Sequence, residues 1–500
     1  MFQRLFLFFI PIRPINLETS VVWWLSRRAL GATLTTGLST IFLLSGCGRS
    51  FNSEALTANG NIKVLILKNK EAISEIEAEE TNPFEFKVVE LLNIYDLISL
   101  SGKYARFYTN ATNKNNNLKG TQPKAQFFKN KKGYFVAKNN FSLELATLYY
   151  HTQNLALIDQ KIGANQLNSL PRKIVIGTKI SNSSFQENNA IYDGGMDAII
   201  YLDYTESNLA LPFNGGIFAH EYFHSLFYKA VQKGLESNAF FKENRDTSEE
   251  KFDLNLAVPK FEKNKFIENS KMNPHSFKKN LSLELNDIKS LSKQNIKDYY
   301  VLLLKGLNEG IADFWGWTYT QDKNFILHSI SKIPSIRTLD LRKHDLQKPE
   351  LVTQNMILNE VMGTFVDQEE KSAYINYFSY IIGTRFALFF KELVAVISKE
   401  RKLSTDEAST IVMKSIFSYL TQLGEKLVKH EFNQNKVNLI SSQDLILEFS
   451  QLLKPTKLPE CQLILDTINS DTKNSKKLSC LMKNEIYTLS SPQEESASDN

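Results

Sequence analysis

The stretch His220-Glu221-Tyr222-Phe223-His224 lies near the middle of the 500-residue chain and decides which fold to look for. Two histidines four positions apart lie on one face of an α-helix, one turn from each other. Both imidazoles can therefore reach a single Zn²⁺ ion. Glu221 lies about a third of a turn away, where its carboxylate can contact a metal-bound water. The alternative is a structural helix with two exposed histidines, so a third ligand is needed to decide.

A second polar group, Asn308-Glu309 with Asp313, lies further along the chain inside the apolar stretch 299–317. Two carboxylates one turn apart would be costly to bury there without partners. A metal ion and a histidine would supply those partners. Glu309 can complete a zinc set with the two histidines and leave the fourth position open. Asp313 can accept a hydrogen bond from the outer nitrogen of a ligand histidine. The alternative is that both carboxylates face solvent on a surface helix.

The two motifs together resemble those of the gluzincins, the thermolysin and aminopeptidase N class of zinc peptidases. The third ligand of that family is the Glu of an Asn-Glu-x-x-x-Asp pattern, which Asn308, Glu309 and Asp313 match. The resemblance spans about residues 140–400. One departure is the spacing, because Glu309 follows His224 by 85 residues, far more than in thermolysin.

The resemblance implies an α+β fold. A small mixed sheet and the zinc-binding helices would form the catalytic domain, and a mainly helical C-terminal part would follow. It also implies one Zn²⁺ per chain, a peptide or protein as substrate, and Glu221 as the general base of peptide-bond hydrolysis.

Two weaker matches concern the substrate. Asn189 and Ala190 precede an expected strand and resemble the thermolysin segment that contacts the substrate main chain, so an extended peptide could pair with this edge. The overlapping Gly194–Asp197 partly matches the aminopeptidase Gly-Ala-Met-Glu-Asn motif, with Asp197 in place of the amine-binding Glu. The alternative is a hairpin turn rich in Gly and Asp.

A candidate for stabilising the developing oxyanion is Tyr380. The sequence Tyr380-Ile381-Ile382-Gly383 resembles the Tyr-x-x-Gly helix start of the aminopeptidase branch, in which the tyrosine donates that hydrogen bond. The alternative is an ordinary core or surface tyrosine. The competing donors are Tyr374, Tyr377, His328 and His344.

The N-terminus resembles that of a bacterial lipoprotein. Arg27-Arg28 precede the apolar run 29–44, which is short for a membrane span and ends at Leu44-Ser45-Gly46-Cys47. Cleavage before Cys47 would free it for acylation, and an uncleaved membrane anchor is the alternative. Gly48, which is not acidic, favours the outer membrane within the cell envelope.

The other two cysteines, Cys461 and Cys480, are 19 positions apart. If Cys47 carries lipid, this even pair is expected to form a disulfide in an exported protein. The alternative is two unrelated thiols.

Composition limits the partners. The formal charge is +5, of which residues 1–46, with four Arg and one Glu, contribute a net +3. No Lys/Arg cluster is paired with aromatic platforms, so nucleic acid is not expected as a partner. The sequence gives no signal for the oligomeric state.

The remaining expectations concern organisation. Strands are expected at 62–67, 134–137, 173–176 and 198–202, a helix at 142–162, and a surface loop or domain boundary at 109–123. Ser404 with Glu407 has capping-box spacing, and Ser442 could cap a later helix. The expected parts are a signal peptide (1–46), a tether (47–60), an N-terminal α/β region of unknown role (61–123), a zinc peptidase domain (124–232 and 296–400), a charged insertion (233–295), a helical C-terminal region (401–490) and a disordered tail (491–500).

Two rival functions stay open. One is a non-catalytic surface lipoprotein with a structural or vestigial zinc site, which would not need Glu221. The other keeps the catalytic fold and acts on a substrate other than a peptide.

Overall fold

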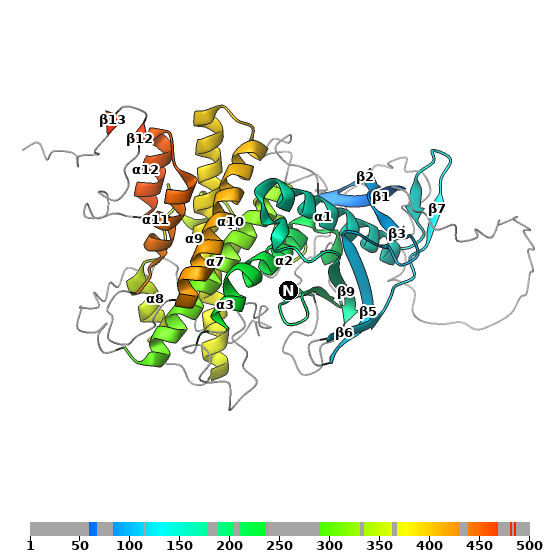
Figure 1. Cartoon of the computed structure of the whole chain (residues 1–500), viewed down its shortest axis with the longest axis horizontal. Helices are drawn as coiled ribbons and strands as arrows, with labels where there is room; N and C mark the ends of the chain where they lie inside the picture. Colours follow the sequence, from blue (N-terminus) through cyan, green and yellow to red (C-terminus); the bar gives the residue numbers. More distant parts are fainter. Residues whose placement is uncertain are drawn as a thin grey trace, which may run out of the picture. The chain divides into compact units, whose positions relative to one another are not determined.

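A computed structural model describes most of the chain after residue 59. The described residues are 60–67, 84–114, 117–178, 188–204, 210–236, 238, 291–330, 335–362, 368–429, 439–468, 481–482 and 485–486. Residues 55–500 belong to one compact unit. The unit is a mixed α and β structure in which small sheets adjoin a larger set of helices (Figure 1).

The larger sheet has five strands in the order β10-β11-β9-β5-β6. Its central strands, β9 and β11, are parallel, and β10 pairs antiparallel with β11 at one edge. The expected strands at 173–176 and 198–202 are confirmed as parts of β9 and β11. The strands span Ala190–Asp193 (β10), Ala198–Leu202 (β11), Arg172–Thr178 (β9), Ala105–Lys114 (β5) and Asn117–Thr121 (β6).

The expectation of a loop or boundary at 109–123 is wrong, because this stretch forms most of the β5–β6 hairpin. The stretch is rich in polar residues because β6 is an exposed edge strand, and the hairpin has an irregularity between Thr109 and Thr112. β5 also pairs in parallel with β9. Residues assigned from the sequence to the N-terminal region and to the peptidase domain therefore share one sheet.

A second sheet has four strands in the order β2-β1-β8-β7. These strands span Phe84–Leu91 (β2), Gly60–Leu67 (β1), Phe135–Ala137 (β8) and Phe127–Lys129 (β7), which confirms the strands expected at 62–67 and 134–137. One face of this sheet contributes Ile62, Val64 and Val89 to the main core, which also contains the apolar side chains of α1. Two-stranded pairs join β3 (Ile94–Asp96) to β4 (Ser101–Gly102) and β12 (Leu481–Met482) to β13 (Glu485–Ile486).

Helix α1 spans Asn140–Ile162 and confirms the helix expected there. Asn139 caps its first turn by accepting a hydrogen bond from the backbone N–H of Ser142, and Gly163 ends the helix in the left-handed conformation (φ 83°). Helix α2 spans Gly215–Phe227, and a single π-helical turn at Tyr228–Gln232 leads into the short α3 at Lys233–Leu235.

From residue 293 onward the described chain is mostly helical, as expected. The longer helices are α7 (Lys293–Thr320), α8 (Gln354–Val361), α9 (Gln368–Arg401), α10 (Thr405–Lys429), α11 (Ser442–Leu453) and α12 (Leu458–Thr467). Helix α7 begins inside the stretch expected to be an insertion, at Lys293. Residues 239–290, where most of that insertion was expected, lie outside the described residues.

Two predicted caps can be compared with the structure. Ser404 and Glu407 form the expected reciprocal hydrogen bonds before α10. The cap of α11 is Ser441 and not Ser442, because the Ser441 hydroxyl accepts from the backbone N–H of Asp444 while the Asp444 carboxylate accepts from the backbone N–H of Ser441. Ser442 is the first residue of the helix.

Helices α7 and α9 approach each other so closely that no side chain fits between them at one point. A Cβ atom on Gly310 would lie 2.3 Å from the backbone oxygen of Gly383, and one on Gly306 would lie 2.4 Å from the Ile382 side chain. Glycine is required here for space. The contact holds the middle of α7, which carries Glu309, directly against α9.

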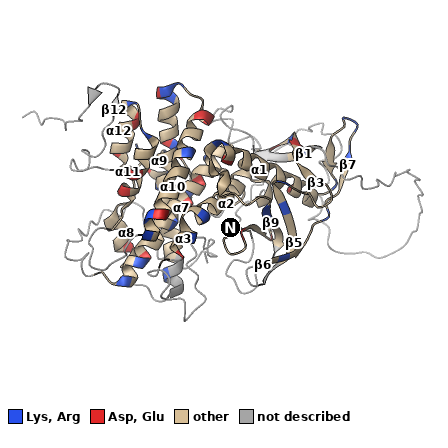
Figure 2. Ribbon diagram, viewed as in Figure 1, with Lys and Arg blue, Asp and Glu red and all other residues tan. Residues whose placement is uncertain are grey.

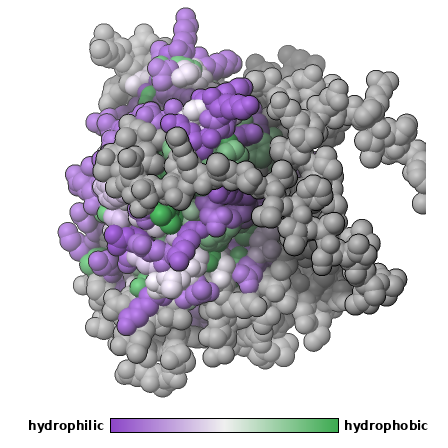
Figure 3. All heavy atoms as spheres, turned by 90° about the vertical axis from the view of Figure 1, so that its right-hand side faces the viewer, coloured by the Kyte–Doolittle hydropathy of each residue, from purple (hydrophilic) through white to green (hydrophobic). Residues whose placement is uncertain are grey.

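The surface of the N-terminal strands differs from the rest. Of the seven large hydrophobic side chains that are exposed among the described residues, five come from residues 84–128. Lys and Arg side chains are also frequent on these strands (Figure 2). Viewed from that side, hydrophobic residues interrupt a mainly hydrophilic surface (Figure 3). Within the described residues, no helix is both long and apolar enough to span a membrane.

Candidate metal centre

The start of α2 is fixed by Asn214. Its side-chain oxygen accepts hydrogen bonds from the backbone N–H groups of Gly216 and Ile217, and its amide nitrogen donates to the carbonyl of Phe325 at 2.7 Å. A side chain at Gly216 would collide with the Phe325 ring. Every residue of α2 is buried, so the helix is held on all sides and the direction of its side chains is set.

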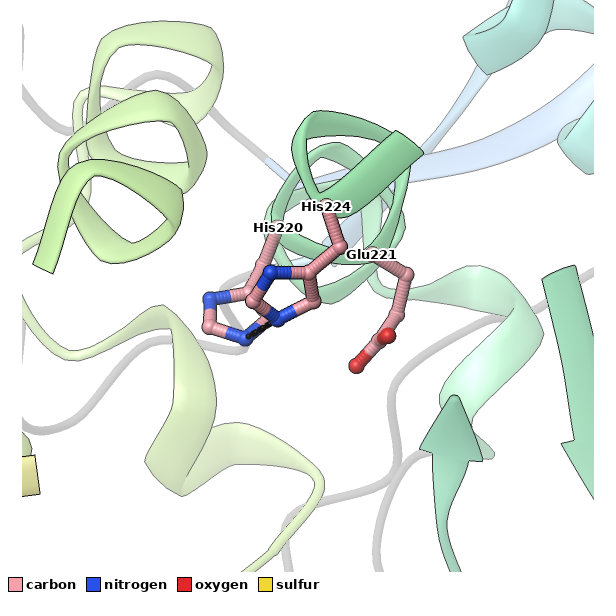
Figure 4. A group of neighbouring side chains, drawn as sticks. All are labelled: His220, Glu221 and His224. Atoms are coloured by element: carbon pink, nitrogen blue, oxygen red, sulfur yellow. Dashed lines mark hydrogen bonds between the residues drawn. The ribbon is translucent and has the colours of Figure 1, made fainter. Parts of the chain in front are cut away.

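His220 and His224 point to the same side of α2, as their spacing predicts (Figure 4). Their Nε2 atoms lie 2.9 Å apart. Glu309, from α7, brings one carboxylate oxygen to 3.4 Å from Nε2 of His220 and the other to 3.8 Å from Nε2 of His224. Ligand atoms of a tetrahedral zinc site lie about 3.3 Å apart when each is about 2.0–2.1 Å from the ion. The three groups thus lie at separations close to those of a zinc ligand set, although the two Nε2 atoms are closer together than in an occupied site.

The outer nitrogens of both histidines have acceptors from α7. Nδ1 of His220 lies 2.9 Å from Oδ1 of Asp313, and Nδ1 of His224 lies 2.9 Å from Oδ1 of Asn308. An Nδ1–H that donates to these oxygens leaves each Nε2 with a lone pair directed into the shared space. Two lone pairs that face each other at this distance require a cation or a proton between them. Asp313 and Asn308 thus stand where the sequence predicts them.

The charges around the site also fit a cation. The carboxylate oxygen Oε2 of Glu309 is buried and makes no hydrogen bond of normal geometry. Burial opposes ionisation of Glu309, but His220, His224 and Arg337 outweigh it and hold its pKa below the usual range. Burial also opposes protonation of His220, yet Asp313 and Glu309 raise its pKa to about 9. The pKa of His224 falls to about 4, first because of burial and then because of His220. The carboxylates of Asp313 and Glu309 thus favour a positive charge at this position.

Glu221 occupies a different position from the three ligands. An oxygen of its carboxylate lies within 4.8 Å of the imidazole nitrogens, which makes it an alternative third ligand by distance alone. Figure 4 shows its carboxylate beside the two rings and not between them, however, and it accepts a hydrogen bond from the backbone N–H of Tyr192 in β10. Burial raises the pKa of Glu221 to about 8, against the opposing charge of His220. This is the environment of a proton acceptor placed next to a metal site.

Arg337 is a member of the site that the sequence motifs do not reveal. It lies in the short 3₁₀ turn Ser335–Arg337 and is buried. Its guanidinium binds both carboxylate oxygens of Asp313, at 2.6 Å and 3.2 Å, and lies 3.6 Å from Glu309. The pKa of Asp313 is held low because Arg337 and His220 outweigh its burial. The only sequence signal was indirect, since two buried carboxylates on one helix need more than one cation.

Tyr380 lies next to this group on α9. The guanidinium of Arg337 stacks on its ring, with Cζ 4.4 Å from the ring centre. Its pKa is raised well above the usual value by burial, then by the nearby charge of Glu309. Three of the competing donors have other partners: Tyr374 binds Glu360, His328 binds Asp322, and His344 binds the carbonyl of Thr338. Tyr380 is therefore the candidate that the structure brings to the site.

The segment with Asn189 and Ala190 leads into β10, the edge strand of the five-stranded sheet. This edge strand contacts the site through the hydrogen bond from Tyr192 to Glu221. Asp197, which replaces the amine-binding Glu of aminopeptidases, already has partners: Arg172 at 2.7 Å, Lys229 at 2.9 Å and the Tyr192 hydroxyl at 2.9 Å. Its role in the structure is therefore to hold β10, β9 and the turn after α2 together.

A buried polar network supports α2 from the side away from the metal ligands. The Tyr222 hydroxyl donates to Asp159 at 2.6 Å, and Asn168 bridges Asp159 and Arg172 at 2.6 Å and 2.8 Å. The guanidinium of Arg172 lies 5.1 Å from the centre of the Tyr222 ring. Burial raises the pKa of Asp159 to about 6, although Tyr222 and Arg172 oppose the change. Because Tyr222 directly follows Glu221, the network fixes the rotation of α2 about its axis.

The cysteine predictions fall only partly within the described residues. Cys461 is buried in α12 and takes part in a disulfide. Cys480, its expected partner, and Cys47, the expected lipidation site, lie outside the described residues. The pairing and the lipidation stay predictions.

Comparison with known proteins gives no family assignment: no protein-family model matches the chain, and no curated protein is similar to it at a significant level.

The ligand geometry predicts the metal content. Purified protein should contain about one zinc per chain, and Glu309→Ala should weaken zinc binding at least about 100-fold because one of three protein ligands is lost. Elemental analysis and a competition titration with a chelator measure both values. Glu144→Ala, which removes a carboxylate from α1 away from the site, serves as the matched control and should keep its zinc. Full zinc retention in Glu309→Ala would show that Glu309 is not a ligand.

Proposed function

We propose that this chain is a zinc-dependent peptidase of the gluzincin class, with His220, His224 and Glu309 as zinc ligands. The observation that carries the proposal is the convergence of these three side chains from α2 and α7 on one buried point. Asp313 and Asn308 hold the outer nitrogens of the histidines, which is the support that zinc-binding imidazoles need. Glu221 adds a buried carboxylate beside the ligands that a purely structural site would not use.

The proposed reaction is hydrolysis of a peptide bond. Zinc, when bound, polarises the scissile carbonyl and lowers the pKa of the attacking water. Glu221 takes the proton of that water and passes it to the leaving amine. Its backbone partner, Tyr192, keeps the carboxylate directed toward the site. The burial that raises the pKa of Glu221 in the metal-free chain makes it a stronger base than an exposed carboxylate.

Substrate binding is proposed at the edge strand β10. An extended peptide can add to the exposed side of an edge strand through main-chain hydrogen bonds. Asn189 and Ala190 lie at the start of β10, and Tyr192 lies between them and Glu221. A peptide on this edge would pass the metal centre, which gives the edge strand a role in fixing the scissile bond.

Tyr380 is proposed to stabilise the developing oxyanion. Its phenol stays protonated because burial and the nearby carboxylates raise its pKa, so it can donate a hydrogen bond throughout the working pH range. Arg337 positions Tyr380 by stacking on its ring and positions His220 through Asp313. The two residues thus connect the 3₁₀ turn and α9 to the metal ligands.

One observation favours the rival function of a non-catalytic lipoprotein with a vestigial site. The guanidinium of Arg337 lies 3.6 Å from Glu309 and places a positive charge next to the metal ligands. That charge, however, is matched by its two shorter contacts with Asp313. The ligand carboxylate of Glu309 keeps one oxygen without a hydrogen bond, which favours an intact metal site. A substrate other than a peptide would use the same chemistry and would appear in assays with other amides or esters.

Removal of the general base is the test of the proposed activity. Glu221→Gln keeps the size and most hydrogen bonding of the side chain but cannot accept a proton, so hydrolysis of unstructured protein should fall about 10²–10⁴-fold. Zinc content, measured on the same samples, should not change. Equal turnover by the variant and the parent would exclude Glu221 as the base. Zinc-loaded parent protein with no hydrolysis of protein, blocked peptide or free-amine peptide would favour the non-catalytic alternative.

The role of Tyr380 predicts a separation of kinetic parameters. Tyr380→Phe should lower kcat about 10²–10³-fold and change KM little, because the hydroxyl acts mainly on the transition state. Tyr377→Phe, one helical turn earlier on α9, is the matched control and should retain kcat. The opposite result, with a silent Tyr380→Phe and a crippled Tyr377→Phe, would mean that the donor is misassigned.

We also propose that the mature protein begins at a lipid-modified Cys47 and is held at the bacterial outer membrane. The support is the short apolar run after Arg27-Arg28 and the small residues before Cys47. Intact-mass analysis of membrane-extracted protein should find an acylated Cys47 and no residues 1–46. Two or more acyl chains are expected, because one chain anchors only weakly. An attached N-terminus with a free Cys47 thiol would identify an ordinary signal anchor instead.

A further inference from the structure

The face of the four-stranded sheet that points away from the core exposes three large apolar side chains, Phe86, Val88 and Phe128. Residues that are paired across neighbouring strands point to the same face of a sheet. Val88 pairs with Lys63, and Phe128 pairs with Val136. Ile62 and its partner Phe135 point to the opposite face, toward the core, so the next residues in each strand, Lys63 and Val136, share the outer one.

The pairing thus defines one row across all four strands, from Val88 through Lys63 and Val136 to Phe128. Phe86 extends the row along β2, since side chains two apart lie on one face. The exposed fractions are 54% for Phe86, 44% for Val88 and 46% for Phe128. Lys63 lies over the Phe86 ring at 4.5 Å from the ring centre. We refer to these five residues as the outer face.

The described N-terminal strands and turns carry an excess of positive charge. The described residues between 60 and 138 include eleven Lys and Arg but only three Asp and Glu, a formal charge of +8. The segment 68–83, outside the described residues, contributes two Lys and five Glu, so that the whole stretch 60–138 has a charge of +5. Lys131 and Lys132 are exposed in the turn of the β7–β8 hairpin, three and four residues after Phe128. Exposed aromatic rings with nearby lysines are the side chains that enter the boundary between lipid headgroups and acyl chains.

The four-stranded sheet also begins close to Cys47 along the chain. β1 begins at Gly60, only 13 residues after Cys47. A segment of that length reaches at most about 45 Å when fully extended. If Cys47 carries lipid, β1 therefore begins within about 45 Å of the lipid-modified residue. This proximity to the bilayer rests on the proposed anchor, whereas the face itself is independent of the proposed zinc chemistry.

We infer that the outer face docks on an anionic phospholipid bilayer, with Phe86, Val88 and Phe128 at the headgroup boundary and Lys63, Lys131 and Lys132 at the lipid phosphates. The lipid chain and the face together give two points of attachment. Two points of attachment restrict the orientation of the protein on the membrane, whereas one lipid anchor would not. The zinc site, built on α2 and α7, would then keep a constant direction relative to the bilayer surface.

The test uses the mature chain from residue 48 onward, which lacks the lipid but retains the compact unit 55–500. It should co-sediment with vesicles of phosphatidylethanolamine and phosphatidylglycerol and bind phosphatidylcholine vesicles at least about tenfold more weakly. Phe86→Asp with Phe128→Asp should weaken binding to the anionic vesicles at least about tenfold, because charged side chains cannot enter the apolar boundary. Lys131→Glu with Lys132→Glu should weaken binding by a similar factor and should reduce its dependence on salt.

Val428→Asp with Leu458→Asp is the matched control, because these are the two exposed large hydrophobic residues of the described chain outside the N-terminal strands. Its vesicle binding should equal that of the parent. All variants alter exposed side chains, and circular dichroism with zinc content verifies their folding. Absence of binding by the parent, or equal loss in the control, would overturn the inference. A dimer that only Phe86→Asp with Phe128→Asp dissociates would show that a second copy covers the face, and would also overturn it.

Discussion

The packing of α2 against α7 places charged and polar side chains in a dry interior, and much of the surrounding structure exists to satisfy them. His220, His224, Glu309, Asp313 and Asn308 are all nearly inaccessible to solvent. An unpaired charge at such depth would cost several kcal/mol. Each group has at least one neighbour of opposite charge or hydrogen-bonding character, and Arg337 contributes the remaining positive charge. Removing one member therefore leaves others without partners, so the group is expected to respond to mutation as a unit.

The need to hold these buried groups in place also explains the hydrogen bonds that surround α2. Asn214 fixes where α2 begins, and the Tyr222–Asp159 hydrogen bond fixes its rotation. Arg172 connects this buried network to Asp197, whose carboxylate also binds the Tyr192 hydroxyl. The backbone of Tyr192 then binds Glu221. A continuous path of polar contacts thus connects α1, the strand β9, the edge strand β10 and α2, which holds Glu221 and β10 in one frame.

The sequence predicted the parts of this arrangement that depend on local periodicity. The i, i+4 spacing of the histidines placed two candidate ligands on one helix face. The i, i+4 spacing of Glu309 and Asp313 placed a third candidate ligand and the hydrogen-bond acceptor of His220 on another helix. The sequence could not identify Arg337. It lies in a 3₁₀ turn of three residues, which is too short to show a periodic pattern, and its role depends on balancing charges that are distant in the sequence. The β5–β6 hairpin was missed because its polar composition reflects exposure, which the pairing of β5 with β9 decides. A shift of one residue at Ser441 has a local cause, since two adjacent serines offer equivalent caps and the Asp444 side chain selects the first.

The contact of α7 with α9 through Gly306, Gly310 and Gly383 has a consequence for how the protein matures. Because the two backbones touch beside Glu309, that ligand has little freedom to move whether or not an ion is present. Bringing the candidate ligands together costs chain entropy. Burial of the apolar core during folding, and not binding of the metal, offsets that cost. Small zinc domains differ, since their chains stay unfolded until the ion arrives. Under the proposed function, folding precedes metal binding, so the chain forms a finished scaffold first and takes up the ion afterwards as a separate, reversible event.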